Sequence, residues 1–433
     1  MTPPPETPVL SEDLQAKISS GDRPLFKDAS YAQRDDGIIA FSKGDYNLAL
    51  QRFEEAVLST PNQPEPEIYL NNTKARIAGN PYAIAAVVPI TKSTDQAKEM
   101  LRGIADAQRL FNDRGGANDR LLEVIISDDE NDPTIARQVA QTLVDSYKNE
   151  LLAIIGHNSS DVSASALEVY EKSKIAMISP TSTSTKLSGS TFFRTVASDA
   201  KSGEVLADYI NRNFKTSSVG LFYVSSSSYS TSLYEAFSQN FRGQVQSYDF
   251  ADSNLDPEEA LNFLETNGID TILLFPNVSQ RDRALGIAKL AKQRNQSFNL
   301  FGGDALYTAQ TLLEGQSAVE GMILVVPWFA EGDYAETAEK RWQGQVSWRT
   351  ATSYDATQAV ITVLESSSQR VQTSEEVVQR LYQPDFTVPQ ELTSGESVFF
   401  DKKGNRKISP ILVEIKTGVP SPMGTTLGFQ PIP

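Results

Sequence analysis

The run Tyr82 to Ile90, YAIAAVVPI, is nearly continuously apolar and contains several β-branched residues. Such a run is typical of a strand that is buried on both faces of a parallel sheet. Short apolar runs then alternate with helical patterns along the chain. Because strands that alternate with helices of about 10 to 15 residues form parallel sheets with helices on both faces, we predict an α/β fold.

The predicted strands are too many for one sheet, so we expect two lobes. The strands are 82–90, 121–127, 152–156, 175–178, 218–224, 271–275 and 299–302, and the helices are 95–112, 133–148, 162–173, 202–213, 230–240, 257–266 and 281–294. We expect two doubly wound parallel sheets joined by a hinge. Lobe 1 would contain residues 82–201 and 327–410, and lobe 2 residues 202–326 and 411–433. Ligands of such sheets bind beyond the carboxyl ends of the strands.

A helical pattern occupies residues 31–80, after a lead-in, residues 1–30, that begins Pro-rich. Small and apolar residues recur where two antiparallel helices would touch, and Gly44 and Asp45 supply the turn between them. These residues are Gly37, Ala40, Tyr46, Ala49, Phe53, Ala56 and Pro61. The spacing resembles the tetratricopeptide repeat, and the alternative is a plain helical hairpin. One repeat cannot bury its own face, so we expect a neighbour or a partner.

The composition excludes several classes of function. The 433 residues include 39 Lys and Arg against 55 Asp and Glu, a net charge of −16, which argues against a nucleic acid as the main partner. No Cys and one His exclude disulfides, thiolate zinc sites, iron–sulfur clusters and multi-His metal sites, and we predict no cofactor. Residues 1–10 lack the basic and apolar regions of a secretory signal, so we expect a cytosolic protein or a mature chain whose export segment has been removed.

Two hydroxyl-rich turns follow predicted strands of lobe 1. The first, Ile154 to Ser160, ends directly before a helix, and the second contains Thr181 and Thr183. Amides and hydroxyls at a helix amino terminus bind a carboxylate or a phosphate, although Ser160 could also be a simple N-cap. Two such turns in one lobe favour a shared anion.

Three residues of lobe 2 are candidates for the same site. Asp304 follows a strand and two glycines, where a carboxylate could accept from a ligand ammonium or merely cap a helix. Tyr229, in a Ser-rich loop, could form an apolar lid with a polar tip or be an ordinary loop tyrosine. Asn277 follows the strand 271–275 and could face the cleft, although Pro-Asn is also a common turn.

Enzymatic patterns are weak in this chain. His157 is close to Ser159 and Ser160, but neighbouring residues at a strand end usually point apart. The acidic run Asp128 to Asp132 lacks the Gly and the terminal Glu of a calcium loop, and we interpret it as a solvated edge. A Gly-rich phosphate loop is also missing, so we expect no catalysis and no binding of ATP.

Several motifs in a fixed order indicate a family. They are Val88-Pro89, Arg102 to Ala107, Asn112 to Gly116, Asp128-Asp129 with Pro133, Gly156-His157, Ile178 to Pro180, Tyr354 to Ala356 and Gly395 to Gly404. From Tyr82 to about Gly418 the chain resembles the type I periplasmic solute-binding proteins of ABC importers, in their leucine/isoleucine/valine-binding branch. The resemblance implies an extracytoplasmic protein, either free or tethered to the membrane, that captures an L-α-amino acid, aliphatic or neutral, and delivers it to the membrane subunits of an ABC permease.

The resemblance also assigns roles to residues. Ser160 would bind the α-carboxylate with its hydroxyl, and Thr183 would add a hydroxyl bond to the same ligand. The Thr181 carbonyl and Asp304 would bind the α-ammonium, and Tyr229 would close from lobe 2. The turn Thr91-Lys92-Ser93 would line the side-chain pocket, where we expect Lys92 to point to solvent. The alternative function is a ligand-sensing receptor, regulator or scaffold that uses the helical module as a protein-docking surface.

Overall fold

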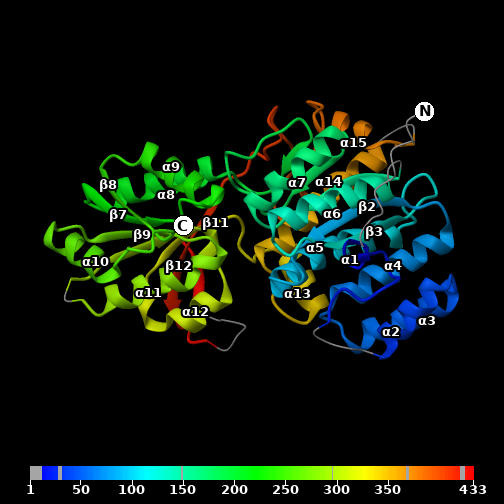
Figure 1. Ribbon diagram of the computed structural model, residues 1–433, viewed down its shortest axis with the longest axis horizontal. Coiled ribbons are helices and arrows are strands. Elements are labelled where there is room, and N and C mark those ends of the chain that lie inside the picture. Colours follow the sequence, from blue (N-terminus) through cyan, green and yellow to red (C-terminus); the bar gives the residue numbers. More distant parts are fainter. Residues whose placement is uncertain (1–11, 28–31, 148–149, 295, 367–369, 420–424) are drawn as a thin grey trace, which may run out of the picture. The chain divides into compact units, whose positions relative to one another are not determined.

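The computed structural model (Figure 1) describes residues 12–433 except 28–31, 148–149, 295, 367–369 and 420–424, so the Pro-rich start of the lead-in lies outside the described residues. The chain forms two compact units. Unit 1 comprises Met1–Thr181, Gly189–Thr195 and Gly332–Arg406, and unit 2 comprises Ser182–Ser188, Val196–Glu331 and Lys407–Pro433. The helical segment predicted over residues 31–80 is therefore part of unit 1.

Unit 1 is built on a six-stranded sheet with the order β1-β3-β2-β4-β5-β6. Its strands are β1 (Ile18–Ser19), β2 (Tyr82–Val88), β3 (Leu122–Asp128), β4 (Leu151–Gly156), β5 (Ala176–Ser179) and β6 (Phe192–Arg194). All neighbours are parallel except β1, which pairs antiparallel with β3. Every residue of β2, β3 and β4 is buried, as expected for strands covered on both faces.

Two pairs of helices cover this sheet. Helix α5 (Thr94–Asp113) packs against α14 (Trp348–Ser366), and α6 (Pro133–Ser146) packs against α7 (Ser160–Lys172). The chain moves from β2 to β3 and then back past β2 to β4, so right-handed connections place α5 and α6 on opposite faces. The remaining helices of this part of unit 1 are α13 (Asp333–Trp342) and α15 (Ser374–Leu381).

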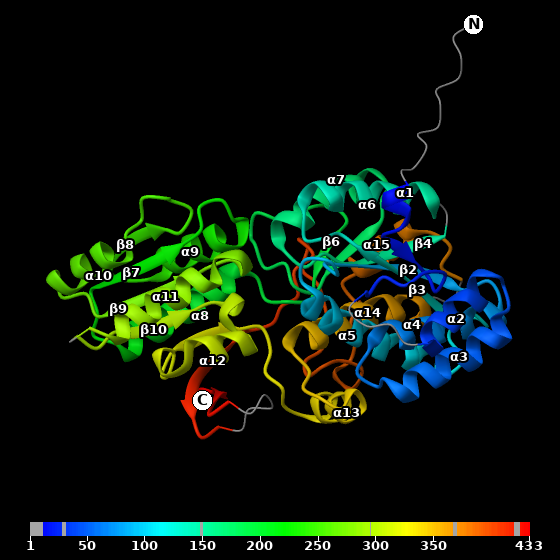
Figure 2. The same ribbon diagram turned by 60° about the horizontal axis from the view of Figure 1, so that its bottom comes forward.

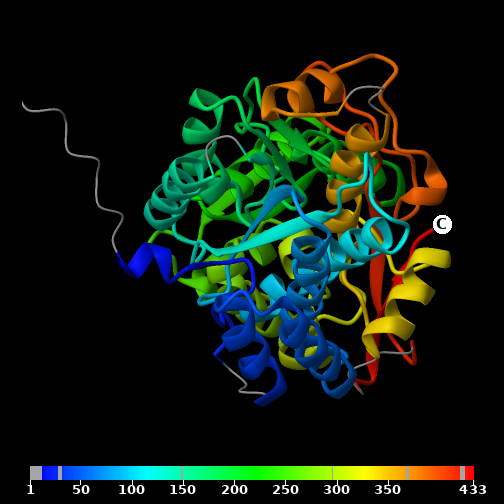
Figure 3. The same ribbon diagram turned by 90° about the vertical axis from the view of Figure 1, so that its right-hand side faces the viewer.

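The N-terminal helices of unit 1 pack onto the rest of that unit. After α1 (Glu12–Gln15) and β1 come α2 (Ala32–Ser42), α3 (Tyr46–Ser59) and α4 (Pro64–Ala78), the blue helices of Figures 2 and 3. Helix α3 packs between α2 and α4, and α4 packs against α5 and β3. The predicted pair of helices, α2 and α3, is present, and its neighbour is α4, which in turn packs on α5 and β3.

Asn72 on α4 joins the N-terminal segment to the edge of the sheet. Its amide nitrogen donates to the carbonyls of Ser20 and Val124, both at 2.8 Å, and its oxygen accepts from the Val124 amide at 2.8 Å and from Gln108 at 2.7 Å. Asn72 is completely buried. One side chain thus completes the hydrogen bonds of β3 beyond the short β1 strand.

Unit 2 contains a seven-stranded sheet with the order β13-β12-β11-β10-β9-β7-β8. Its strands are β7 (Ser218–Tyr223), β8 (Gln244–Asp249), β9 (Thr271–Phe275), β10 (Asn299–Gly302), β11 (Ile323–Val326), β12 (Ile411–Thr417) and β13 (Leu427–Pro431). The helices are α8 (Asp199–Asn213), α9 (Ser228–Asn240), α10 (Pro257–Thr266), α11 (Arg281–Lys292) and α12 (Ala309–Gly315). Strands β12 and β13 are antiparallel additions at one edge.

Side chains of alternate strand residues enter two separate cores. Leu221 and Leu273 pack with α8 and α9, whereas Phe222 and Leu274 pack with α10 and α11. This alternation is the consequence of the two-residue period of a strand. The predicted α/β class with two largely parallel sheets is confirmed, although the antiparallel edge strands were not predicted. Among the described residues, no helix has the length and apolar character needed to cross a membrane.

Candidate functional site

Each sheet has one point where the chain reverses its direction of winding. In unit 1, β2 lies between β3 and β4, and in unit 2, β7 lies between β8 and β9. The loops that leave such a pair of neighbouring strands run to opposite sides, which opens a crevice at the carboxyl ends. The crevice of unit 1 is bordered by the turns after β2 and β4. That of unit 2 is bordered by the turns after β7 and β9.

Ser160 lies at the crevice of unit 1. It is the first residue of α7, after the N-cap Ser159, and its side chain is buried. The first amides of a helix have no partner within the helix, and the helix dipole places partial positive charge there. The sequence analysis considered Ser160 as an N-cap, but the structure gives that position to Ser159. A buried hydroxyl at the positive end of a helix dipole suits a carboxylate.

Thr181 follows β5 and ties this turn in place. Its hydroxyl donates to the carbonyls of His157 at 2.9 Å and Asn158 at 2.7 Å. The hydroxyl is therefore engaged in holding the turn before Ser160. The group of Thr181 that is predicted to bind the ligand is its backbone carbonyl, which takes no part in these two hydrogen bonds.

A buried polar cluster behind this turn was missed by the sequence analysis. Nδ1 of His157 lies 2.7 Å from Oδ2 of Asp129, and Nε2 lies 3.2 Å from the Tyr170 hydroxyl. All three side chains are fully buried. Both ring nitrogens thus face partners other than Ser159 and Ser160. Burial raises the pKa of Tyr170 well above its usual value, so the phenol stays neutral.

The interpretation of the acidic run as a solvated edge is wrong for its first two residues. Asp128 and Asp129 are buried, because β3 continues through Asp128 into the carboxyl-end edge. The Asp128 carboxylate accepts from the Thr91 hydroxyl and from the Thr91 amide at 3.3 Å. Asp132, by contrast, is exposed and caps α6. A preceding strand of apolar residues was the signal that could have identified the buried pair.

Thr183 belongs to unit 2, whereas the sequence analysis placed it in the first lobe with Thr181. Its side chain is buried, and its Oγ1 has no hydrogen-bond partner among the described residues. Its carbonyl accepts from the Asp199 amide at 2.9 Å. An unpartnered buried hydroxyl costs about 1 to 3 kcal/mol, so Thr183 is a group that a ligand or a water would complete.

Tyr229 and Asp304 lie together at the carboxyl-end edge of unit 2. Tyr229 is in the first turn of α9, and its hydroxyl accepts from the Ala305 amide at 3.4 Å. Burial first, and then the charge of Asp304, raises the pKa of Tyr229 well above its usual value. A side chain at Gly303 would meet the Tyr229 hydroxyl at 2.4 Å, which explains the glycine before Asp304.

Asn277 borders the crevice of unit 2 after β9. Its Oδ1 accepts from the Gln280 amide at 3.0 Å and from the Ser279 hydroxyl at 2.9 Å. It therefore caps the short helical turn Val278–Gln280. The sequence analysis gave an ordinary turn as the alternative role of Asn277, and the structure contains this turn. The side-chain amide nitrogen of Asn277 is the group still suited to a ligand.

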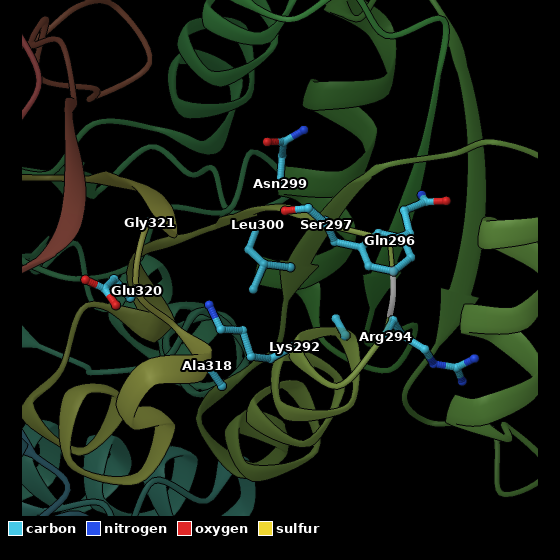
Figure 4. A pocket seen from close by; sticks show the side chains of 11 residues that line it. Lys292, Arg294, Gln296, Ser297, Asn299, Leu300, Ala318, Glu320 and Gly321 are labelled. Atoms are coloured by element: carbon cyan, nitrogen blue, oxygen red, sulfur yellow. The ribbon is translucent and has the colours of Figure 1, made fainter.

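Unit 2 contains a cavity of about 400 Å³, and its lining includes Lys292, Arg294, Asn299 and Glu320, whose side chains are drawn in Figure 4. Asn299 begins β10, whereas Asp304 follows the end of that strand. The cavity thus lies at the amino end of β10, and none of the predicted site residues lines it. In the part of the chain that the structure describes, no group of three or more His, Cys, Asp or Glu side chains could hold a metal ion.

Comparison with known proteins gives a family match over most of the chain. Residues 81–418 match the model of a family described as periplasmic binding protein. The chain is 28% identical over 151 residues to the leucine-, isoleucine-, valine-, threonine-, and alanine-binding protein of Pseudomonas aeruginosa. That alignment covers 34% of this chain and 40% of the relative, so the chain matches well under half of the relative's length.

Solved structures share the fold at low sequence identity. A leucine binding protein from Thermotoga maritima aligns with a TM-score of 0.68 and 20% identity, covering 80% of this chain and 97% of that protein. A branched-chain amino acid transporter substrate binding protein from Streptococcus pneumoniae, solved with isoleucine, aligns with a TM-score of 0.67 and 17% identity, covering 82% and 99%. These similarities confirm the two-lobed fold predicted for residues 82 onward.

Proposed function

This chain belongs to the periplasmic binding protein family, and we propose that it is an extracytoplasmic solute-binding protein that captures a free L-α-amino acid. It would deliver this ligand to the membrane subunits of an ABC permease. The names of the relatives and the isoleucine held by a structural neighbour support an aliphatic or neutral amino acid. The family also supports a location outside the cytoplasm.

The observation that carries this proposal is the amino end of α7 at the crevice of unit 1, with Ser160 buried beside it. This end would bind the α-carboxylate, and the unpartnered hydroxyl of Thr183 would add a hydrogen bond. The Thr181 carbonyl and the Asp304 carboxylate would bind the α-ammonium. Tyr229 would cover the ligand as a neutral phenol, and Asn277 would contribute its amide nitrogen.

The mechanism we propose is the hinge closure that the family resemblance implies. A zwitterion that is bound by groups of both units favours the state in which both reach it. Excluding water strengthens the charge pairs, but each buried charge then requires its partner, because an uncompensated one costs about 3 to 5 kcal/mol. The charged groups of the ligand thus determine what fraction of the protein molecules is in the closed state.

The test is a thermal-shift assay of the full chain against the twenty amino acids, with di-acids, amides, urea and short peptides alongside. A ligand that binds only the folded state raises the midpoint, by the equivalent of about 2.7 kcal/mol at one hundred times its Kd. We expect a set of α-amino acids to stabilise the chain, and Asp304→Ala to abolish the shift. Asp282→Ala, an exposed aspartate of α11 in the same unit, is the matched control.

A folded chain that responds to none of these ligands would contradict the transport proposal. It would favour the alternative, a ligand-sensing receptor, regulator or scaffold. Asp282→Ala should respond like the unmodified chain, and a lost response in that variant would mean that the assay detects damage to unit 2 in general.

We also propose that the N-terminal helices are a tetratricopeptide-like docking surface for a protein. Ala49, Phe53 and Ala56 are fully buried between the helices, as the repeat pattern requires. On the outside, the side chains of Ile39 and Leu48 are 51% and 40% exposed. A photo-crosslinking residue at position 39, with the same residue at exposed position 138 on α6 as control, would test this. Cross-links to one discrete protein from position 39 alone support it, and equal labelling from both contradicts it.

A further inference from the structure

Two carboxamide side chains meet at the crevice of unit 1. The Asn158 amide nitrogen donates to Oε1 of Gln96 at 2.8 Å. Asn158 lies in the turn after β4, and Gln96 lies in the first turn of α5, which follows β2. These are the two turns that border the crevice. Asn158 is buried and Gln96 is half-buried, so the hydrogen bond between them is partly shielded from solvent.

The pair is close to the group that would hold the ligand. Asn158 precedes Ser160 by two residues, so their Cα atoms are at most about 7 Å apart. The carbonyl of Asn158 accepts from the Thr181 hydroxyl at 2.7 Å, which holds in place the turn that carries Asn158 and Ser160. A ligand whose α-carboxylate binds at Ser160 would therefore bring its side chain within reach of this pair.

The remaining hydrogen-bonding groups of the pair define a pattern. A bond between two carboxamides uses one N–H and one C=O, and it leaves the oxygen of one amide and the NH₂ of the other. This holds for either orientation of the two amides. The pair thus keeps one acceptor and one donor for a further partner, and a primary carboxamide carries the matching donor and acceptor.

The neighbouring turn residues add polarity to this crevice. The Thr91 hydroxyl donates to the buried Asp128 carboxylate, which also accepts from the Glu130 amide at 2.9 Å. The carboxylate would repel a ligand side chain that carries its own negative charge. An aliphatic side chain packed against the amide pair would leave a donor and an acceptor without partners.

We propose that this crevice selects an amino acid with a carboxamide side chain, asparagine or glutamine, over a branched aliphatic one. The inference rests on the proposed function, and it identifies the ligand class within it. A site that hydrogen-bonds a polar ligand group discriminates strongly against the analogue without that group, because its own buried groups then remain unpaired. Asn158 and Gln96 would be the residues that determine specificity.

The experiment is a calorimetric titration of the full chain with glutamine, asparagine and leucine. We expect one of the two amides to bind at least about tenfold more tightly than leucine. Gln96→Leu and Asn158→Leu should each lower this ratio by about tenfold, which is the loss of one buried hydrogen bond. Gln138→Leu, on the exposed face of α6, is the matched control and should leave the ratio unchanged.

The outcomes distinguish a failure of this inference from a failure of the proposed function. Leucine binding more tightly than both amides would overturn the inference and leave an amino-acid-binding protein. Equal weakening of all ligands by the two substitutions would also overturn it, because a purely structural tie between the turns predicts no change in ratio. If no amino acid binds, the proposed function itself fails. Should Asn158→Leu not fold, the ranking by the unmodified chain and the Gln96→Leu ratio decide the question.

Discussion

Asp304 and Tyr229 lie together in unit 2, yet their replacements should have unequal effects. Asp304→Ala removes the carboxylate proposed for the ligand ammonium, and the uncompensated charge should weaken binding by about 3 to 5 kcal/mol, a factor of about 150 to 4,000. Tyr229→Phe keeps the ring and loses one hydroxyl, so we expect less than about a tenfold loss. Titration calorimetry with the best ligand of the panel measures both. Equal, small effects would count against the assignment of Asp304.

Asp106 on α5 should make stability depend on pH. Its Oδ2 accepts from the Trp342 indole at 3.0 Å, its Oδ1 lies 2.9 Å from Nε of Arg341, and burial raises its pKa to about 7. Between about pH 4 and 7 the folded protein therefore holds a proton that the unfolded chain has lost. The free energy of unfolding contributed by this group falls as the pH rises through that range.

Asp106→Asn removes this titration, so the variant should gain stability relative to the unmodified chain between pH 5 and pH 8. The gain should be of the order of a few kcal/mol, because each pKa unit corresponds to about 1.4 kcal/mol. Urea denaturation at the two pH values measures it, with Asp95→Asn, exposed on the same helix, as control. Parallel pH profiles for Asp106→Asn and the unmodified chain would show that Asp106 does not titrate in this range.

The candidate site residues that could be predicted are those that come soon after a predicted strand, because this position in the chain is enough to place them at the edge of the sheet. Ser160 comes four residues after the end of β4 and Asp304 two residues after the end of β10, and parallel strands all end at one edge. The partners of His157 could not be predicted, since Asp129 lies 28 residues away and Tyr170 is on another element. The amide pair of Asn158 and Gln96 was missed for the same reason, because 62 residues separate its members.

At the level of elements, Gly103 determines how closely α5 approaches α14. A Cβ at this position would lie 2.0 Å from the Thr350 carbonyl oxygen and 2.7 Å from the Tyr354 nitrogen. Backbone atoms cannot give way as a flexible side chain can, so Gly103→Ala should cost more than about 2 kcal/mol. Gly286→Ala on α11 is the control with the opposite sign, because nothing lies near its Cβ and alanine favours the helix by about 0.5 to 1 kcal/mol. Thermal unfolding of the two variants tests this, and equal midpoints would contradict it.

Most of the buried strands were predicted and the edge strands were not, but the buried interior strand β11 was also missed. The bounds of β9 and β10 are as predicted, because both are apolar runs within a parallel sheet. Strand β8 was missed, since its sequence QVQSYD is polar and partly exposed at the sheet edge. Strand β1 has two residues, too few for any periodic pattern, and only its pairing with β3 defines it.

At the scale of the whole molecule, the N-terminal segment is an integral structural part of unit 1. Its helix α4 covers β3 and α5, and β1 extends the sheet beside β3. A fully buried ion pair, Arg34 with Glu65 at 3.0 Å, holds α2 to α4, and Glu65 also accepts from the Leu25 amide at 2.7 Å. The sequence analysis expected a module preceding the lobes, and local spacing could not reveal that its last helix completes the core of unit 1.

Removal of residues 1–80 should therefore destabilise the remaining chain. It would uncover the apolar face of α5 and replace the two hydrogen bonds that Asn72 makes with Val124 by bonds to water, at about 0.5 to 1.5 kcal/mol for each. We expect a midpoint at least about 5 °C lower, or an aggregating product, whereas Leu58→Ser, at a side chain 83% exposed on α3, should leave the midpoint unchanged. Ligand binding per folded molecule should persist, because none of the proposed binding residues precedes residue 81. An unchanged midpoint after the deletion would mean that the helices are merely attached to unit 1, and it would remove the structural explanation for their presence.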